Sequence, residues 1–171
     1  DGPIAYTILT AAAVSADVGY GGVDAADVAV TNTDNDVAGF TVNPTAGLTT
    51  TEAGGVASFT VVLTSQPVAV VALGVTSSDI TEGTVALAAL TFTAADWNTP
   101  QTVTVSGVDD ALADGNIAYT IVTAAAVSTD PNYSGRDAAD VAMTNTDDDV
   151  AGFTVSPTAG LLTSEAGATA T

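Results

Sequence analysis

Short runs in which apolar and polar residues alternate, separated by turn-forming residues, recur along the whole sequence. The segment Ala57–Leu63 places Phe59, Val61 and Leu63 on one face, and Gln101–Gly107 alternates valines with threonines. Because successive side chains of a strand point to opposite faces, this period of two predicts half-buried β-strands. No stretch has the apolar spacing of an amphipathic helix, so the pattern predicts an all-β fold.

About seven short strands are expected in one folded unit, which indicates a sandwich of two packed sheets. A first strand is split by Pro44 and Gly47, and Val68–Val75 is nearly continuously apolar, which predicts a buried central strand. Trp97 is expected to plug one end of the core. The expected strands are Phe40–Val42 with Leu48–Thr51, Ala57–Leu63, Val68–Val75, Ala89–Thr93, Gln101–Gly107, Ile117–Thr123 and Ala138–Thr144.

A long internal repeat defines the domain organisation. Residues 1–58 align without a gap with residues 114–171 at a constant offset of 113, and 43 of the 58 aligned positions are identical. A repeat of this length has the size of one sandwich domain. We therefore expect a tandem array in which residues 1–36 are the C-terminal part of a preceding repeat, 37–149 are one complete repeat, and 150–171 are the N-terminal strands of the next. The partial ends could instead pair with neighbouring chains.

The sequence is strongly acidic, and its charge is confined to a few clusters. Its 20 Asp and Glu residues stand against one positively charged side chain, Arg136, and the formal net charge is −19. Nucleic acid is therefore excluded as a partner, because binding it requires Lys and Arg that neutralise phosphates. No apolar run reaches the ~18 residues of a membrane-spanning helix, so no membrane insertion is expected. The absence of cysteine excludes disulfides and thiolate metal sites.

An acidic stretch occurs twice, where one repeat meets the next. It comprises Thr31–Phe40 in the first copy and Thr144–Phe153 in the second. Because alternate loops of an antiparallel sandwich lie at the same end, the loop Val108–Gly115 and the run Asp147–Asp149 are expected to bring five or more carboxylates together. Like charges at such distances cost several kcal/mol and raise some pKa values, and a bound cation removes this conflict.

Calcium is the cation that this donor set favours. Ca²⁺ takes six to eight oxygen ligands at about 2.3–2.6 Å, whereas Mg²⁺ demands a tighter octahedron and Zn²⁺ prefers His and Cys, which are absent. The spacing does not match an EF-hand loop. The alternative interpretation is that aspartates are solvated turn formers. We adopt it for Asp17, Asp24, Asp27, Asp96, Asp130, Asp137, Asp140 and Glu82.

Several short motifs mark the complete repeat. They are Thr51-Glu52-Ala53-Gly54-Gly55 leading into Phe59-Thr60-Val61-Val62-Leu63, Ser78-Asp79 before Glu82-Gly83-Thr84-Val85, Leu90-Thr91-Phe92-Thr93, Trp97–Val105, Asp109-Asp110 and Asp147-Asp148-Asp149. With these motifs, the whole 113-residue repeat resembles the Calx-beta repeats of exchanger regulatory domains and of large bacterial surface proteins. The resemblance implies an immunoglobulin-like antiparallel β-sandwich that binds calcium at one end.

The resemblance also implies a set of calcium ligands. In the complete repeat these are Glu52, Asp79, Asp109, Asp110, Asp114, Asp147, Asp148 and Asp149, and in the partial copies the candidates are Asp1, Asp34, Asn35, Asp36 and Glu165. Ala111, Leu112 and Ala113 stand where the exchanger motif is richer in Glu and Asp, so fewer or weaker ions are expected. Asn35 replaces the middle Asp of the first copy but keeps an oxygen ligand.

Catalysis is not expected, because His, Cys and Lys are absent and most nucleophile–base pairs cannot be built. The expected function is that of a calcium-stabilised structural repeat in a large secreted or surface-displayed bacterial protein, such as an adhesin stalk or a surface fibre. Its partners would be neighbouring repeats of the same chain. One alternative is a filament subunit joined by strand pairing between identical chains. Another is a calcium-dependent module for a carbohydrate or other cell-surface partner, which the few aromatic residues support little.

Overall fold

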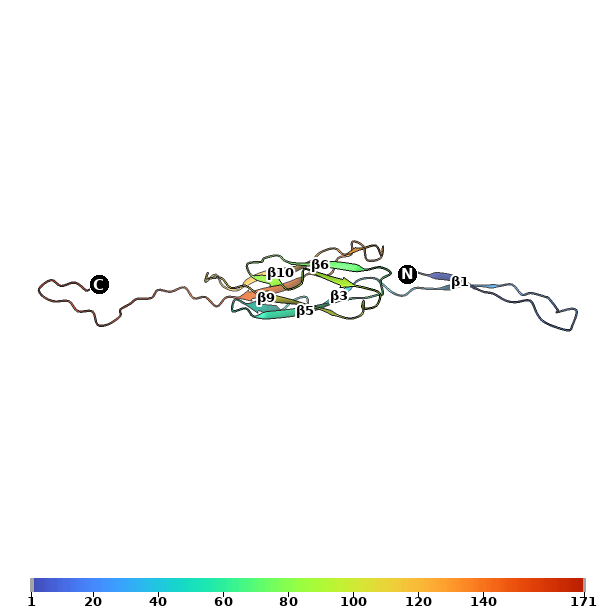
Figure 1. The fold of residues 1–171 in the computed structure, drawn as a ribbon, viewed down its shortest axis with the longest axis horizontal. Coiled ribbons are helices and arrows are strands. Elements are labelled where there is room, and N and C mark those ends of the chain that lie inside the picture. The colour runs from blue at the N-terminus through green and yellow to red at the C-terminus, as the bar shows by residue number, and fades with distance from the viewer. Residues whose placement is uncertain (1, 171) are drawn as a thin grey trace.

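The computed structural model describes residues 2–170, which form twelve β-strands. Strands β3–β12 build one sandwich in the middle of an elongated molecule (Figure 1). The N-terminal hairpin, made of β1 (Ile4–Ile8) and β2 (Val28–Asn32), extends from one end of this sandwich, and the C-terminal segment (residues 150–170) extends from the other. None of the described residues belongs to a helix long and apolar enough to cross a membrane.

The ten strands of the sandwich lie in two sheets. They are β3 (Phe40–Asn43), β4 (Leu48–Thr51), β5 (Val56–Leu63), β6 (Val71–Ser77), β7 (Gly83–Val85), β8 (Ala89–Phe92), β9 (Gln101–Gly107), β10 (Ile117–Thr123), β11 (Val127–Ser128) and β12 (Val141–Thr146). One sheet has the order β3-β5-β9-β7. The other has the order β11-β6-β10-β12-β4, with β8 also paired to β6. The fold is thus the immunoglobulin-like, all-β sandwich expected from the sequence.

The pairing of β4 with β12 is parallel, whereas the other strand pairs of the described residues are antiparallel. In this pair Met143 lies opposite Leu48, and Thr146 lies opposite Thr51. Because the two strands run in the same direction, both end at the same edge of the sandwich. The residues that follow β4 and the acidic run that follows β12 therefore lie side by side.

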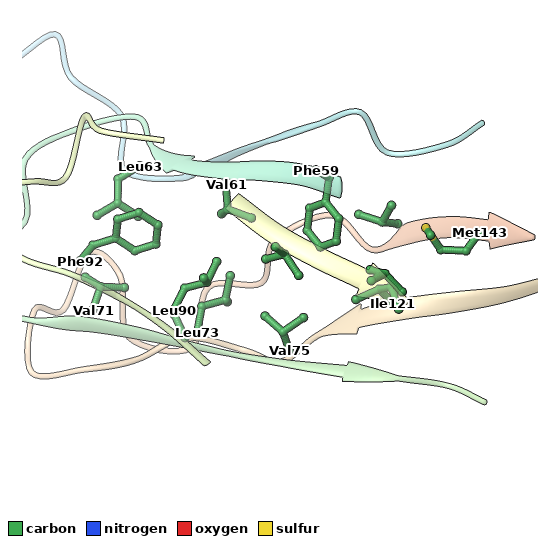
Figure 2. Packing of buried hydrophobic residues seen from close by; sticks show 14 of the residues in the cluster. Phe59, Val61, Leu63, Val71, Leu73, Val75, Leu90, Phe92, Ile121 and Met143 are labelled. Atoms are coloured by element: carbon green, nitrogen blue, oxygen red, sulfur yellow. The ribbon is translucent and has the colours of Figure 1, made fainter. Parts of the chain in front are cut away.

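The core consists of the inward-facing residues of both sheets. Phe59, Val61 and Leu63 of β5 are at most 3% exposed, and they pack toward Val71 and Leu73 of the opposite sheet (Figure 2). Burial of such side chains contributes about 1.5–3 kcal/mol each to the free energy of folding. The period of two in the sequence is the signal that predicted this core.

The expected central strand was partly wrong. β6 begins at Val71 instead of Val68, and Val68 and Val70 are 69% and 53% exposed. The backbone N–H of Val68 donates to Oδ2 of Asp130 at 2.8 Å, which holds this segment in a loop. An apolar run alone does not reveal such a competing hydrogen bond.

Other predicted strand boundaries differ from the observed ones where side-chain hydrogen bonds fix a loop. β12 begins at Val141 instead of residue 138, because Thr123 donates its hydroxyl to the carbonyl of Ala138 and its N–H to Asp140 Oδ1. The short strands β7 and β11 were not predicted, because strands of three and two residues are too short to show an alternating pattern. Trp97 packs against the core as expected.

The N-terminal hairpin repeats the geometry of β10 and β12. Ile4 lies opposite Asn32 in the hairpin, and Ile117 lies opposite Asn145 in the sandwich, which is the same register shifted by one repeat. The exposure differs, because Ile8 is 51% exposed and its equivalent Ile121 is 0% exposed. The assignment of residues 1–36, 37–149 and 150–171 to three successive repeats stays a prediction.

Candidate metal centre

All charged side chains of the described residues lie outside the strands. A charge on the inner face of a sheet would lose its hydration without a partner, which explains why the strands themselves carry no charged residue. The loops after β4, β9 and β12, together with the turn before β7, carry a set of acidic residues that meet at one end of the sandwich. We call this end the acidic end, and its members are Glu52, Glu82, Asp109, Asp110, Asp114, Asp147, Asp148 and Asp149.

Within the acidic end, the carboxylates form three groups in which the candidate ligand oxygens lie within 4.8 Å of one another. The groups are Glu52 with Asp147 and Asp149, Glu52 with Asp109 and Asp148, and Glu82 with Asp110 and Asp114. Glu52 belongs to two of them. Each group joins residues from loops that are distant in the chain, so the fold, and not local sequence, creates the proximity.

Glu52 is the most buried of these carboxylates, with only 3% of its surface exposed. Its backbone N–H donates to the carbonyl of Thr146 at 3.1 Å, which extends the parallel pairing of β4 and β12 by one step. The N–H of Asp148 donates to Glu52 Oε2 and stabilises the charged form. Loss of hydration and the charges of neighbouring aspartates outweigh that bond and raise the pKa of Glu52.

Asp147 is held as a charged residue by the backbone. Its Oδ1 accepts the N–H of Asp149 at 2.7 Å, and its Oδ2 accepts the N–H of Gly115 at 2.6 Å. These two bonds lower the pKa of Asp147. Gly115 adopts a φ of 82°, a left-handed conformation that glycine allows at little cost. The acidic run is therefore tied to the loop that precedes β10.

Asp149 carries an unsatisfied oxygen. Its Oδ2 is buried and has no hydrogen-bond partner within residues 2–170. Desolvation, followed by repulsion from Asp147 and Asp148, raises the pKa of Asp149. A buried acceptor without a partner costs about 1–3 kcal/mol, and more when it is charged. The site thus offers an oxygen that a cation would satisfy.

A buried polar network supports the third group. Asn145, 1% exposed, donates its Nδ2 to the carbonyl of Val108 at 3.0 Å and to Glu82 Oε2 at the longer distance of 3.4 Å. Its Oδ1 accepts the hydroxyl of Thr50 at 3.0 Å, and Thr50 in turn bonds the hydroxyl of Tyr119 at 2.9 Å. The network fixes the end of β12 against the loop after β9 and holds Glu82 beside it.

Gly107, the last residue of β9, lets the acidic loops approach one another. A Cβ at this position would collide with the carbonyl of Thr51 and would lie 2.7 Å from Asn145 Oδ1. Its N–H donates to the carbonyl of Gly55 at 3.0 Å. Because glycine has no side chain, the loop Val108–Gly115 can lie close to the residues that follow β4.

The structure brings together most of the ligands predicted for the complete repeat, namely Glu52, Asp109, Asp110, Asp114, Asp147, Asp148 and Asp149. Asp79 is not a member of the three groups. Its Oδ1 accepts the hydroxyl and the N–H of Thr81, which together lower its pKa, so this side chain shapes its own turn. That these residues bind calcium stays a prediction.

The equivalent acidic residues of the partial copies lie apart from the acidic end. Asp34 Oδ2 accepts the N–H of Gly2 at 2.6 Å and its Oδ1 accepts the N–H of Asp36 at 3.0 Å; the N–H of Asp36 and then that of Gly2 lower the pKa of Asp34 to about 2. Asn35 lies exposed between these two aspartates. Glu165 lies exposed in the C-terminal segment, and Asp1 lies outside the described residues.

Two residues interpreted as solvated turn formers are buried, and that interpretation was wrong for both. Glu82 is 7% exposed and belongs to the third group, whereas Asp130 is 1% exposed and accepts the N–H groups of Val68 and Asn132. Asp130 has a structural role at the opposite end of the sandwich. Glu82 and Asn145 are the functional candidates that the sequence did not reveal. The one signal for Glu82 was its place in the motif before Gly83.

No protein-family model matches the sequence, and a search of curated proteins finds no match either. Among solved structures, the chain is similar to the periplasmic chaperone SfaE at 7% identity and a TM-score of 0.48, over 64% of this chain and 58% of that chain. It is similar to WR4, a C. elegans MSP family member, at 15% identity and a TM-score of 0.40, over 63% and 95%. It is also similar to domains 4 and 5 of the S-layer protein SbsC at 22% identity and a TM-score of 0.41, over 71% and 59%. At such identities the likeness concerns the fold alone.

Proposed function

We propose that the acidic end binds calcium and that the complete repeat is a calcium-stabilised structural module. The observation that carries this proposal is the position of Glu52, a carboxylate that is 3% exposed and lies among the aspartates of two groups. Carboxylates that are crowded and buried require either protonation or a cation. The raised pKa values of Glu52 and Asp149 express this requirement in the metal-free protein.

Calcium fits the donor set better than other common metal ions. The three groups offer only carboxylate oxygens, and the chain contains no His or Cys that zinc would prefer. Ca²⁺ accepts irregular arrangements of six to eight oxygens, which suits ligands contributed by several loops. Glu52, Asp147 and Asp149 would form the first site, and Glu82, Asp110 and Asp114 would form a second beside Asn145.

Calcium would add stability to a fold that has no disulfides. The chain has no cysteine, so disulfides cannot staple the sandwich. An ion that binds only the folded state adds about 2.7 kcal/mol when its free concentration is 100-fold above Kd. This is a substantial part of the roughly 5–15 kcal/mol by which domains are stable.

The position of the site supports a structural function in a tandem array. The acidic end directly precedes the C-terminal segment, so a bound ion would fix the point where one repeat leads into the next. A string of Calx-beta-like repeats stiffened in this way would serve as an adhesin stalk or a surface fibre of a secreted or surface-displayed bacterial protein. The repeat would act without catalysis, because the chain lacks His, Cys and Lys.

The carbohydrate-binding alternative gains no support. Tyr133, one of the few aromatic residues, is 1% exposed, and its hydroxyl donates to the carbonyl of Ser65 at 2.6 Å. It packs edge-on against Phe40 with ring centroids 5.9 Å apart. Tyr133 is therefore a core residue and not part of a sugar-stacking surface.

Small-angle X-ray scattering of the 171-residue chain in calcium and in chelator tests the proposal. We expect a larger maximum dimension and a narrower distribution of distances in calcium, because the ion fixes the direction in which the C-terminal segment leaves the sandwich. Magnesium at equal concentration is the control for ionic strength. Identical profiles in calcium and chelator would contradict a stiffening role.

A further inference from the structure

The N-terminal hairpin exposes the same apolar face that the sandwich buries. Tyr6, Ile8 and Val28 are each 51% exposed, whereas their equivalents one repeat later, Tyr119, Ile121 and Val141, are 4%, 0% and 0% exposed. The sequences of the two strand pairs are nearly identical. The exposed fractions differ because β10 and β12 have neighbouring strands in the sandwich, whereas the hairpin has none within residues 2–170.

The hairpin is nevertheless built like its counterpart. Thr10 donates its N–H to Asp27 Oδ1 at 2.9 Å, as Thr123 does to Asp140 Oδ1 at 2.9 Å. The register of the two strands is also conserved. The hairpin therefore presents a preformed edge and face, and a partner strand would find the geometry already in place.

The sandwich shows which strand completes this edge. β4 pairs in parallel with β12, with Leu48 opposite Met143 and Thr50 opposite Asn145. One repeat later, Leu161–Ser164 in the C-terminal segment is the equivalent of β4, and it forms no strand in the structure. The chain thus carries both an open acceptor edge and an unused copy of the strand that fits it.

The two elements cannot meet within one molecule, because the hairpin and the C-terminal segment extend from opposite ends of the sandwich (Figure 1). We propose that Leu161–Ser164 of one chain pairs in parallel with β2 of a second copy, with Leu161 opposite Val30 and Thr163 opposite Asn32. This is strand addition to an open sheet edge. Where a further copy of the repeat precedes the hairpin in a longer chain, that copy would supply the same strand.

Two more contacts accompany this pairing in the sandwich. Phe40 packs on Tyr133, and one repeat away the equivalents are Phe153, 102% exposed, and Tyr20, 66% exposed. Phe153 of the incoming chain would cover Tyr20. Glu165 would reach Asp34 and Asp36 as Glu52 reaches Asp147 and Asp149, and this last contact rests on the proposed calcium function.

The resulting interface joins the tail of one chain to the hairpin of the next, so it does not close and generates linear assemblies. It lacks counterparts of β5, β7 and β9, which in the sandwich belong to the opposite sheet and cover the inner face of these strands, and of β6, which pairs with β10. The association is therefore weak and depends on concentration. Its specificity lies in the strand register.

Sedimentation velocity of the full chain over a concentration series tests the proposal, with substitutions in the exposed C-terminal segment that cannot unfold the sandwich. Leu161→Asp should abolish association, because the equivalent Leu48 faces the core. Leu162→Asp is the matched control and should leave association unchanged, because the equivalent Thr49 is exposed. Absence of association in the unmodified chain, or an equal effect of both substitutions, would overturn the proposal.

A mixing experiment separates strand addition from unspecific aggregation. Val30→Asp removes the acceptor and leaves the C-terminal segment intact, whereas Leu161→Asp does the reverse. Each variant alone should sediment as a monomer, and an equimolar mixture should form dimers that grow no further. A mixture that stays monomeric would overturn the proposal.

The calcium contribution has its own readout. Glu165→Gln should leave association in chelator unchanged and should remove the part that calcium adds. A result in which calcium does not strengthen association of the unmodified chain, while the Leu161 and Leu162 variants behave as expected, would support strand addition. The same result would overturn the proposal that an ion is shared between Glu165 and the aspartates of the second copy. Calcium binding by the complete repeat itself is tested separately through Glu52.

Discussion

The carboxylate of Glu52 accepts a hydrogen bond from the backbone N–H of Asp148 at 3.2 Å, although 96 positions separate the two residues in the chain. The contact follows from the parallel pairing of β4 with β12, which ends both strands at the same edge. Two acidic segments are thus forced together by strands that contain no charge. The fold itself imposes the electrostatic conflict that a cation would resolve.

Replacement of Glu52 by glutamine should have opposite effects with and without calcium. In calcium the variant loses a charged ligand, and its affinity should fall at least about tenfold, the lower range found for residues that merely support a metal site. In chelator its melting temperature should rise, because a neutral amide no longer repels Asp147 and Asp149. Calorimetric titration and thermal unfolding measure the two effects.

The matched control for this variant is Glu165→Gln, which changes the equivalent residue in the exposed C-terminal segment. At low protein concentration it should alter neither the calcium affinity of the acidic end nor the melting temperature of the sandwich. A loss of affinity as large as that of Glu52→Gln would show that the effect is one of total charge and not of the buried site.

The stability of the metal-free protein should rise on mild acidification. Folding raises the pKa of Glu52 above its ordinary value of 4.5 and that of Asp149 above 3.8. The protonated forms of these two carboxyl groups therefore stabilise the folded state fully below the ordinary values, and this stabilisation is lost as the pH rises through the pKa values of the folded protein. Asp79, Asp96 and Asp147 have lowered pKa values, and their contribution is lost as the pH falls below 3.8.

Urea unfolding in chelator should therefore give a free energy of unfolding that increases from pH 7 toward about 4.5 and decreases below about 3.8. With calcium present, the free energy of unfolding should instead decrease from pH 7 toward about 4.5, because protons compete with the ion for the same oxygens. A metal-free stability that falls steadily from pH 7 downward would contradict the conflict among the buried carboxylates. The Glu52→Gln variant should show a smaller rise.

Asn145→Leu should destabilise the sandwich by about 2–4 kcal/mol, because it removes the hydrogen bond to the carbonyl of Val108 and one of the two buried partners of the Thr50 hydroxyl. It should also weaken calcium binding, because Glu82 loses the hydrogen bond from Asn145 Nδ2 that holds its carboxylate. Asn32→Leu is the control, because the equivalent residue lies exposed in the hairpin. Urea unfolding and calorimetry on both variants check the prediction, and equal effects would refute it.

Ile121→Ala should lower the free energy of unfolding by about 2–5 kcal/mol, because it opens a cavity in the core. Ile8→Ala removes the equivalent side chain from the exposed hairpin and should change the stability by less than about 0.5 kcal/mol. Urea unfolding compares the two. Similar losses would mean that the hairpin contributes to the same cooperative unit.

The sequence was sufficient for the parts of the fold that depend on alternation and repetition. Phe59, Val61 and Leu63 signal their burial by period two, and β9 and β10 have the predicted bounds. The repeat also places the acidic run at the end of the sandwich. These features are local or periodic, so a single sequence contains them.

Features that depend on particular side-chain hydrogen bonds could not be predicted. Glu82 resembles a turn residue, yet it is 7% exposed and its Oε2 accepts a hydrogen bond from Asn145, which is 63 positions away. Asp79 was placed among the ligands by its motif, yet its bonds to Thr81 turn it into a local cap. The carboxylate of Asp130 holds Val68 in a loop across 62 positions, which no apolar pattern records.

The most direct test of the calcium claim is a calorimetric titration of Ca²⁺ into the metal-free chain, combined with thermal unfolding in calcium and in chelator. We expect saturable binding by the unmodified chain, much weaker binding by Glu52→Gln, and a melting temperature higher by roughly 10 °C when free calcium is 100-fold above Kd. No binding heat together with identical melting temperatures in calcium and chelator would contradict the claim.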